Sequence, residues 1–112
     1  MEMSRREQTL LQLKNIVLQT MNDVQVNIYL FGSWARNEEK RTSDIDIGFL
    51  PIEKIPIKKW VELRDKIEES HLAYSVDVVD LSKVDSSLVK VVVEEGIVWK
   101  DCTKGFKVQI GH

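Results

Sequence analysis

The hydrophobic pattern of the chain changes its period several times, from helical spacing to strand-like runs and back. Near the start, apolar residues recur at the spacing of one helix face. Ser4 and Glu7 stand before this segment in a capping-box pattern. Runs rich in β-branched and aromatic residues follow and favour strands. Together the pattern predicts helices over residues 4–21 and 56–70 and strands over 26–31, 44–50 and 76–79.

Residues 82–95 carry conflicting signals. Their valines favour a strand by propensity, whereas Ser86 as an N-cap and Gly96 as a C-terminal stop favour a helix. The pattern alone leaves this choice open. A short apolar segment over residues 97–99 follows, and the tail over 100–112 shows so little periodicity that we expect it to be loosely ordered.

Size and composition narrow the classes of protein. A chain of 112 residues with 43% hydrophobic and 30% charged residues predicts one soluble globular domain, residues 1–112. The net charge of −2 gives no long-range attraction to nucleic acid, which argues against direct nucleic-acid binding. No apolar run reaches the ~20 residues of a membrane-spanning helix, and the N-terminus lacks the apolar core of a signal peptide. The single Cys102 excludes an internal disulfide and fits a reducing cytoplasm.

Asp44 and Asp46 are the first candidates for chemistry. Alternate residues of a strand share a face, so we expect the two carboxylates to point the same way while Ile45 and Ile47 enter the core. Two carboxylates on one face repel each other. A divalent cation removes that cost, because Mg²⁺ binds one or two carboxylates together with phosphate oxygens. The pattern therefore indicates a metal site on this strand.

Gly32 and Ser33, at the end of the preceding strand, offer the phosphate side of such a site. Glycine lets the backbone approach a ligand closely. We expect a short helix to begin here, and the N–H groups at a helix start favour anions. A triphosphate and a metal ion would then lie side by side.

The spacing of these residues resembles a known signature. Gly32-Ser33, then ten residues, then Asp44-Ile45-Asp46, is similar to the motif of the DNA polymerase beta-like nucleotidyltransferase superfamily. The motif occupies a short window, but turn, spacing and flanking strands agree with it. The resemblance implies an α+β (α/β) fold, a small mixed β-sheet with helices packed on one face.

Further residues resemble the small bacterial branch of this superfamily, the minimal nucleotidyltransferases. These are Ala35-Arg36 after the serine and Ser43 before the first aspartate. One departure is Asn37, where relatives often carry glycine. Asparagine tolerates the left-handed backbone conformation, so we expect the turn to be retained. Relatives also carry a helix in the ambiguous segment 82–95, which leads us to predict one here.

Asp77 interrupts a valine strand, with Val76 and Val78 on the opposite face. From the pattern alone, an aspartate facing water on an edge strand explains it equally well, because a buried one is costly unless paired or metal-bound. The resemblance favours the metal site, since the superfamily places a third catalytic carboxylate on a neighbouring strand. Asp80, at the end of the strand, is expected to be a turn or cap residue.

The function implied by the resemblance is metal-dependent nucleotidyl transfer. Asp44, Asp46 and Asp77 would be the catalytic residues and hold two Mg²⁺ ions, with Mn²⁺ as an alternative. Gly32 and Ser33 would bind the nucleotide, ATP. Minimal nucleotidyltransferases resemble the antitoxins of toxin–antitoxin pairs, in which AMP is transferred to a tyrosine of a HEPN-domain toxin. We therefore expect a cytoplasmic protein adenylyltransferase that forms a hetero-oligomer with such a toxin.

Two alternatives stay open. The chain would instead be a non-catalytic antitoxin that inhibits its partner by complex formation, or the catalytic lobe of a two-subunit small-molecule adenylyltransferase. The presence of all three carboxylates favours catalysis over binding alone.

Overall fold

The structure is a computed structural model that describes residues 3–102. The greater part of the predicted loose tail, residues 103–112, lies outside the described residues. The elements form two compact units, helices α1 and α2 in one and the sheet with α3 in the other. Within residues 3–102, no helix is both long and apolar enough to cross a lipid bilayer. In chain order the elements are α1 (Arg5–Thr20), β1 (Val26–Phe31), η1 (Gly32–Trp34), β2 (Ile45–Pro51), α2 (Ile57–Glu69), β3 (Val76–Asp80), η2 (Leu81–Lys83), α3 (Ser86–Glu95) and β4 (Ile97–Lys100).

Helix α1 begins where the capping box predicts it. The Ser4 hydroxyl accepts a hydrogen bond from the Glu7 backbone N–H at 3.1 Å, and the Ser4 N–H donates to the Glu7 carboxylate at 3.3 Å. Two of the backbone N–H groups at the helix start thereby gain partners. The helix ends at Thr20, and the N–H of the C-cap residue Met21 bonds to the carbonyl of Val17.

Helix α2 is tied to the end of α1 by Lys59. Its ammonium group donates to the Thr20 carbonyl at 3.1 Å and forms an ion pair with Asp23 at 3.0 Å. Apolar residues at helical spacing along this helix are buried only in part, since Leu63 is buried but Ile57 is 77% exposed. Ile57 is the first helical residue, directly after the N-cap Pro56, and a helix end has fewer neighbours to pack against.

The other unit contains a four-stranded mixed sheet in the order β3-β2-β1-β4. Strand β1 is antiparallel to β2 and β4, whereas β2 and β3 are parallel. The predicted α+β fold with a small mixed sheet is confirmed. One sheet face is lined by fully buried aliphatic and aromatic side chains, those of Val26, Ile28, Leu30, Ile45, Ile47 and Phe49.

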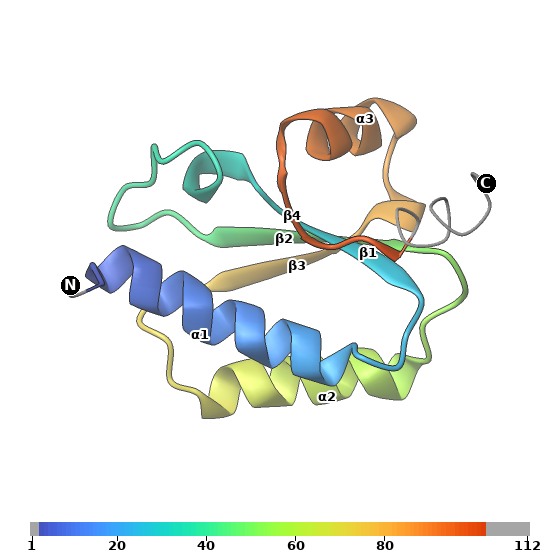
Figure 1. Ribbon diagram of the computed structural model, residues 1–112, viewed down its shortest axis with the longest axis horizontal. Coiled ribbons are helices and arrows are strands. Elements are labelled where there is room, and N and C mark those ends of the chain that lie inside the picture. The colour runs from blue at the N-terminus through green and yellow to red at the C-terminus, as the bar shows by residue number, and fades with distance from the viewer. Residues whose placement is uncertain (1–2, 103–112) are drawn as a thin grey trace, which may run out of the picture. The chain divides into compact units, whose positions relative to one another are not determined.

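Helix α3 lies over the opposite face of the sheet (Figure 1). Val92 is buried in a cluster with Tyr29 and Leu81, whereas Val91 and Val93 beside it are 48% and 42% exposed. The backbone N–H of Val89 bonds to the Asp85 carbonyl four residues earlier, at 3.2 Å, which is the hydrogen-bond pattern of a helix, so the ambiguous segment is a helix as predicted. Its N-cap is Asp85 instead of Ser86, and the N–H of Gly96 closes it on the Val92 carbonyl at 2.8 Å.

Candidate functional site

The turn after β1 brings Gly32 against the carboxylate of Asp46. Gly32 has φ +76°, in the left-handed region that favours glycine. A Cβ at this position would clash with Oδ2 of Asp46. Position 32 therefore favours glycine for two reasons, the left-handed backbone angle and the lack of space for a side chain beside Asp46. The sequence predicted a close approach at Gly32, and in this structure the approaching group is an aspartate of the next strand.

The expected short helix is a single 3-10 turn, η1. The N–H groups of Ala35 and Arg36 both bond to the Gly32 carbonyl, at 3.1 and 3.2 Å. Ser33 follows Gly32 and accepts a hydrogen bond from the Glu38 N–H at 2.9 Å through its carbonyl. The turn then closes at Asn37, whose φ of 58° confirms that this residue takes the left-handed conformation expected of it.

Trp34 anchors this turn, a role that the sequence analysis missed. Its side chain is 1% exposed, and its indole N–H donates to the Ser43 carbonyl at 3.4 Å. The Tyr74 ring meets it edge-on with 4.8 Å between ring centroids. The contact holds the loop between β1 and β2, and the only signal in the sequence was a large aromatic residue directly after the Gly-Ser pair.

The strand register brings Asp46 and Asp77 together. They are paired residues of the parallel strands β2 and β3, so both side chains stand on the sheet face that carries Tyr29. Asp44 lies directly before β2 and not within it, since the strand begins at Ile45. Asp77 is exposed on an edge strand, as the solvent-facing interpretation expected, and also lies beside a second carboxylate, as the metal-site interpretation expected.

Burial raises the pKa of Asp46, and the negative charges of Asp77 and Asp44 raise it further. The positive charge of Arg36 opposes this increase. Asp44 and Asp77 therefore lie close enough to Asp46 to repel its negative charge.

A cation fits this donor set by its chemistry. Carboxylate oxygens are the ligands that Mg²⁺ prefers, and a positive charge would relieve the repulsion that the raised pKa of Asp46 reflects. Within residues 3–102, however, no three His, Cys, Asp or Glu side chains are close enough together to hold a metal ion as they stand.

Asp80, at the end of β3, is a cap residue as predicted. Its Oδ1 accepts hydrogen bonds from the Ser82 backbone N–H at 3.0 Å and from the Ser82 hydroxyl at 2.6 Å. These bonds use the carboxylate to start the turn η2. Asp80 is therefore not part of the carboxylate group at the other end of the strand.

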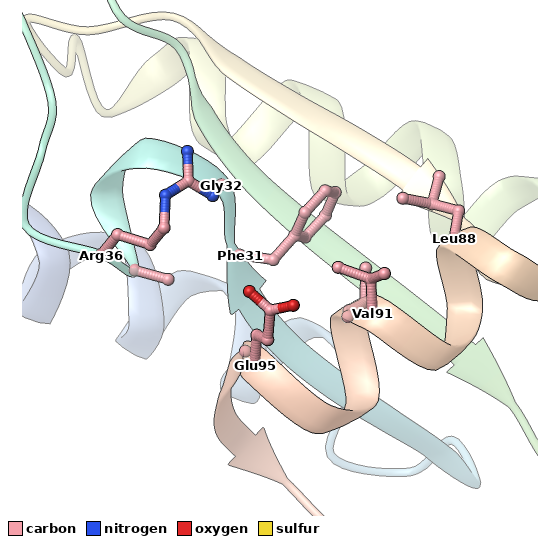
Figure 2. A pocket seen from close by; sticks show the side chains of 9 residues that line it. Phe31, Gly32, Arg36, Leu88, Val91 and Glu95 are labelled. Carbon is pink, nitrogen blue, oxygen red and sulfur yellow. The ribbon is translucent and has the colours of Figure 1, made fainter.

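A pocket of about 160 Å³ opens beside the Gly32 turn. Phe31, Leu88 and Val91 give it apolar walls, and Arg36 and Glu95 add charged groups. Figure 2 shows Arg36, from the turn after β1, and Glu95, from the last turn of α3, reaching toward the end of β1 where Phe31 lies. The sequence analysis did not foresee this pocket, because its residues come from segments far apart in the chain.

Comparison with known protein families identifies the family of this chain. The pattern that describes the polymerase beta nucleotidyltransferase family matches residues 12–101. The chain belongs to this family. The match spans the Gly32 turn and all three carboxylates. The residues described above therefore lie within a nucleotidyltransferase domain.

A curated relative in the family is the protein adenylyltransferase MntA of Shewanella oneidensis. It is 41% identical over 70 residues, which are 62% of this chain and 49% of the relative. The matched part thus spans about half the length of that protein.

Two crystal structures have a similar fold. One is a toxin–antitoxin with AMP-PNP, with a TM-score of 0.64 and 28% identity over 85% of this chain and 78% of that chain. The other is a complex of tri-AMPylated Shewanella oneidensis HEPN toxin with MNT antitoxin, with a TM-score of 0.58 and 26% identity over 88% of this chain and 77% of that chain.

Proposed function

We propose that this protein transfers AMP from ATP to a tyrosine hydroxyl of a HEPN-domain toxin and thereby acts as its antitoxin. The observation that carries the proposal is the contact of the Gly32 turn with Asp46, which is itself paired in register with Asp77. Membership of the nucleotidyltransferase family supports the reaction type, and the AMPylated toxin in a similar complex supports the acceptor.

In this proposal Gly32 and Ser33 bind the triphosphate, and Asp44, Asp46 and Asp77 hold two Mg²⁺ ions, or Mn²⁺ in their place. When bound, the ions neutralise charge on the triphosphate and on the leaving pyrophosphate. The carboxylates position the α-phosphate against the incoming hydroxyl. Catalysis here is chiefly positioning and charge stabilisation, which suits a small domain.

The tyrosine oxygen forms a bond to the α-phosphorus of ATP. The bond from that phosphorus to the bridging oxygen breaks, and its electron pair leaves with pyrophosphate. The hydroxyl proton passes to the carboxylate of Asp77, which is exposed and can return the proton to water. The toxin then carries AMP on its tyrosine.

We further propose that residues 1–112 act as one catalytic domain in the cytoplasm and that the partner supplies the acceptor surface. The family match extends over residues from both compact units, which supports a single domain. The free thiol of Cys102 fits a reducing compartment.

The test is to mix the purified protein with a HEPN-domain partner, ATP and Mg²⁺ and to measure the partner's mass. We expect the mass to rise by whole AMP groups. The double variant Asp44→Ala, Asp46→Ala should leave it unchanged, whereas Asp65→Ala, which removes a carboxylate from the exposed side of α2, should behave as the wild type.

The same variants separate the competing functions. If the double variant still neutralises the toxin fully in cells, inhibition works by complex formation and the enzymatic proposal is wrong. If the partner is never modified but a small hydroxyl compound is, the chain is the lobe of a small-molecule adenylyltransferase.

A further inference from the structure

We propose that the pocket between η1 and α3 receives the adenine base of the nucleotide and that Glu95 recognises its 6-amino group. The inference rests on the proposed function, because it assigns the nucleoside end of the same ATP. It goes beyond that function by naming the residues that select the base.

The first argument is position. Gly32 lines the pocket and also contacts Asp46, so the pocket and the candidate phosphate turn share a residue. A triphosphate bound at this turn leaves its ribose and base within reach of Phe31 and of the facing side of α3. The apolar pocket beside this turn is a place in which the base can leave water.

The second argument is size and lining. A cavity of roughly 150 Å³ walled by aliphatic and aromatic side chains takes a benzene ring, and this pocket is similar, at about 160 Å³. It therefore suits a flat heteroaromatic ring that enters edge first and keeps one edge at the mouth. Leu88 and Val91 are partly exposed on α3, and a base between them and Phe31 would cover them.

The third argument is the polar chemistry at the mouth. An ionised Glu95 can only accept hydrogen bonds, whereas Arg36 can only donate them. The 6-amino group of adenine is a donor, but the 6-carbonyl group of hypoxanthine is an acceptor that Glu95 would repel. Arg36 lies on the side of Gly32 (Figure 2), so its positive charge would face the phosphates of a nucleotide bound at this turn. Its ion pair with Glu38, at 2.7 Å, uses only one of its nitrogen atoms.

The test compares ATP, ITP and inorganic tripolyphosphate, each with Mg²⁺, by titration calorimetry. Val91→Trp would fill the pocket, and Val93→Trp is its matched control, since Val93 has similar exposure on the same helix and does not line the pocket. We expect Val91→Trp to weaken ATP binding about tenfold, as loss of one base contact should. Its affinity for tripolyphosphate should equal that of the wild type.

Glu95→Lys tests the recognition of the amino group, with Glu94→Lys as a control of equal charge change on the same helix turn. The wild type should prefer ATP to ITP by about tenfold, and Glu95→Lys should lose or invert that preference. Wild-type ATP affinity in Val91→Trp, or equal binding of ATP and ITP by the wild type, would overturn the inference alone. If the wild type binds neither ATP nor tripolyphosphate, the proposed function fails as well.

Discussion

Asp46 lies at the centre of the candidate site, between Gly32 and Asp77. Its carboxylate fills the space left by the missing side chain of Gly32 and stands next to Asp77 across the β2–β3 pairing. Burial and two neighbouring negative charges raise its pKa above the ordinary value of 3.8, and only Arg36 opposes them. A charge held at such a place costs stability, and groups with raised pKa values of this kind gather at binding and catalytic sites.

This cost has a defined pH dependence. Because the folded protein holds the Asp46 proton to a higher pH than the unfolded chain does, stability falls as pH rises from 3.8 through the folded-state pKa. The penalty is then fully present at neutral pH. We expect Asp46→Asn to raise the free energy of unfolding at pH 7, with no gain below 3.8, and to abolish AMP transfer.

Urea denaturation at several pH values measures the effect of Asp46→Asn. Asp65→Asn removes the same charge from the exposed side of α2 and serves as the control. A lower stability of Asp46→Asn than of the wild type at pH 7 would show that the carboxylate supports the fold.

At the scale of elements, the helices divide between stability and function. Helix α1 contributes none of the candidate site residues, and its start depends on the reciprocal bonds between Ser4 and Glu7. Helix α3 packs Val92 into the core of its unit and presents Val91 and Glu95 to the pocket. A change at the start of α1 should therefore affect folding and not nucleotide binding.

We predict that Ser4→Ala lowers the free energy of unfolding by about 1 kcal/mol, the usual cost of losing an N-cap side chain. Thermal or urea unfolding measures the loss, and calorimetry with ATP and Mg²⁺ should show unchanged affinity. The control is Asn15→Ala, an exposed position within the same helix. If Ser4→Ala is no less stable than this control, the capping box contributes nothing in solution.

For the whole molecule, the proposed function makes nucleotide binding depend on charge. The chain carries a net charge of −2 and brings three carboxylates to the place where a triphosphate is proposed to bind. Without a cation, the triphosphate and the carboxylates repel each other. With Mg²⁺, the same carboxylates attract the nucleotide through the ion.

ATP affinity should accordingly be at least about tenfold higher in Mg²⁺ than in EDTA. Titration calorimetry under both conditions provides the measurement, and the double variant Asp44→Ala, Asp46→Ala should lose the dependence on Mg²⁺. Equal affinity of the wild type in Mg²⁺ and EDTA would rule out the metal site.

Local features of the chain were predictable because each depends on residues close together in the sequence. The strand Val26–Phe31 has the predicted bounds, and the capping box at Ser4 starts α1. Asn37 has the left-handed backbone angle that its residue type suggested. The Gly-Ser turn and the spacing to Asp44 were sufficient to indicate the family, because turn chemistry and strand alternation leave a short signature.

Tertiary structure alone decided which distant residues meet. The parallel pairing of β2 with β3 places Asp77 beside Asp46, and the pattern of either strand is equally compatible with a solvent-facing aspartate. The packing of the valine-rich helix, with Val92 buried against Tyr29, also formed the pocket next to Gly32. The pattern along the chain records how each residue relates to its near neighbours, whereas charge repulsion, cavities and burial depend on contacts that form only when the strands and α3 pack together.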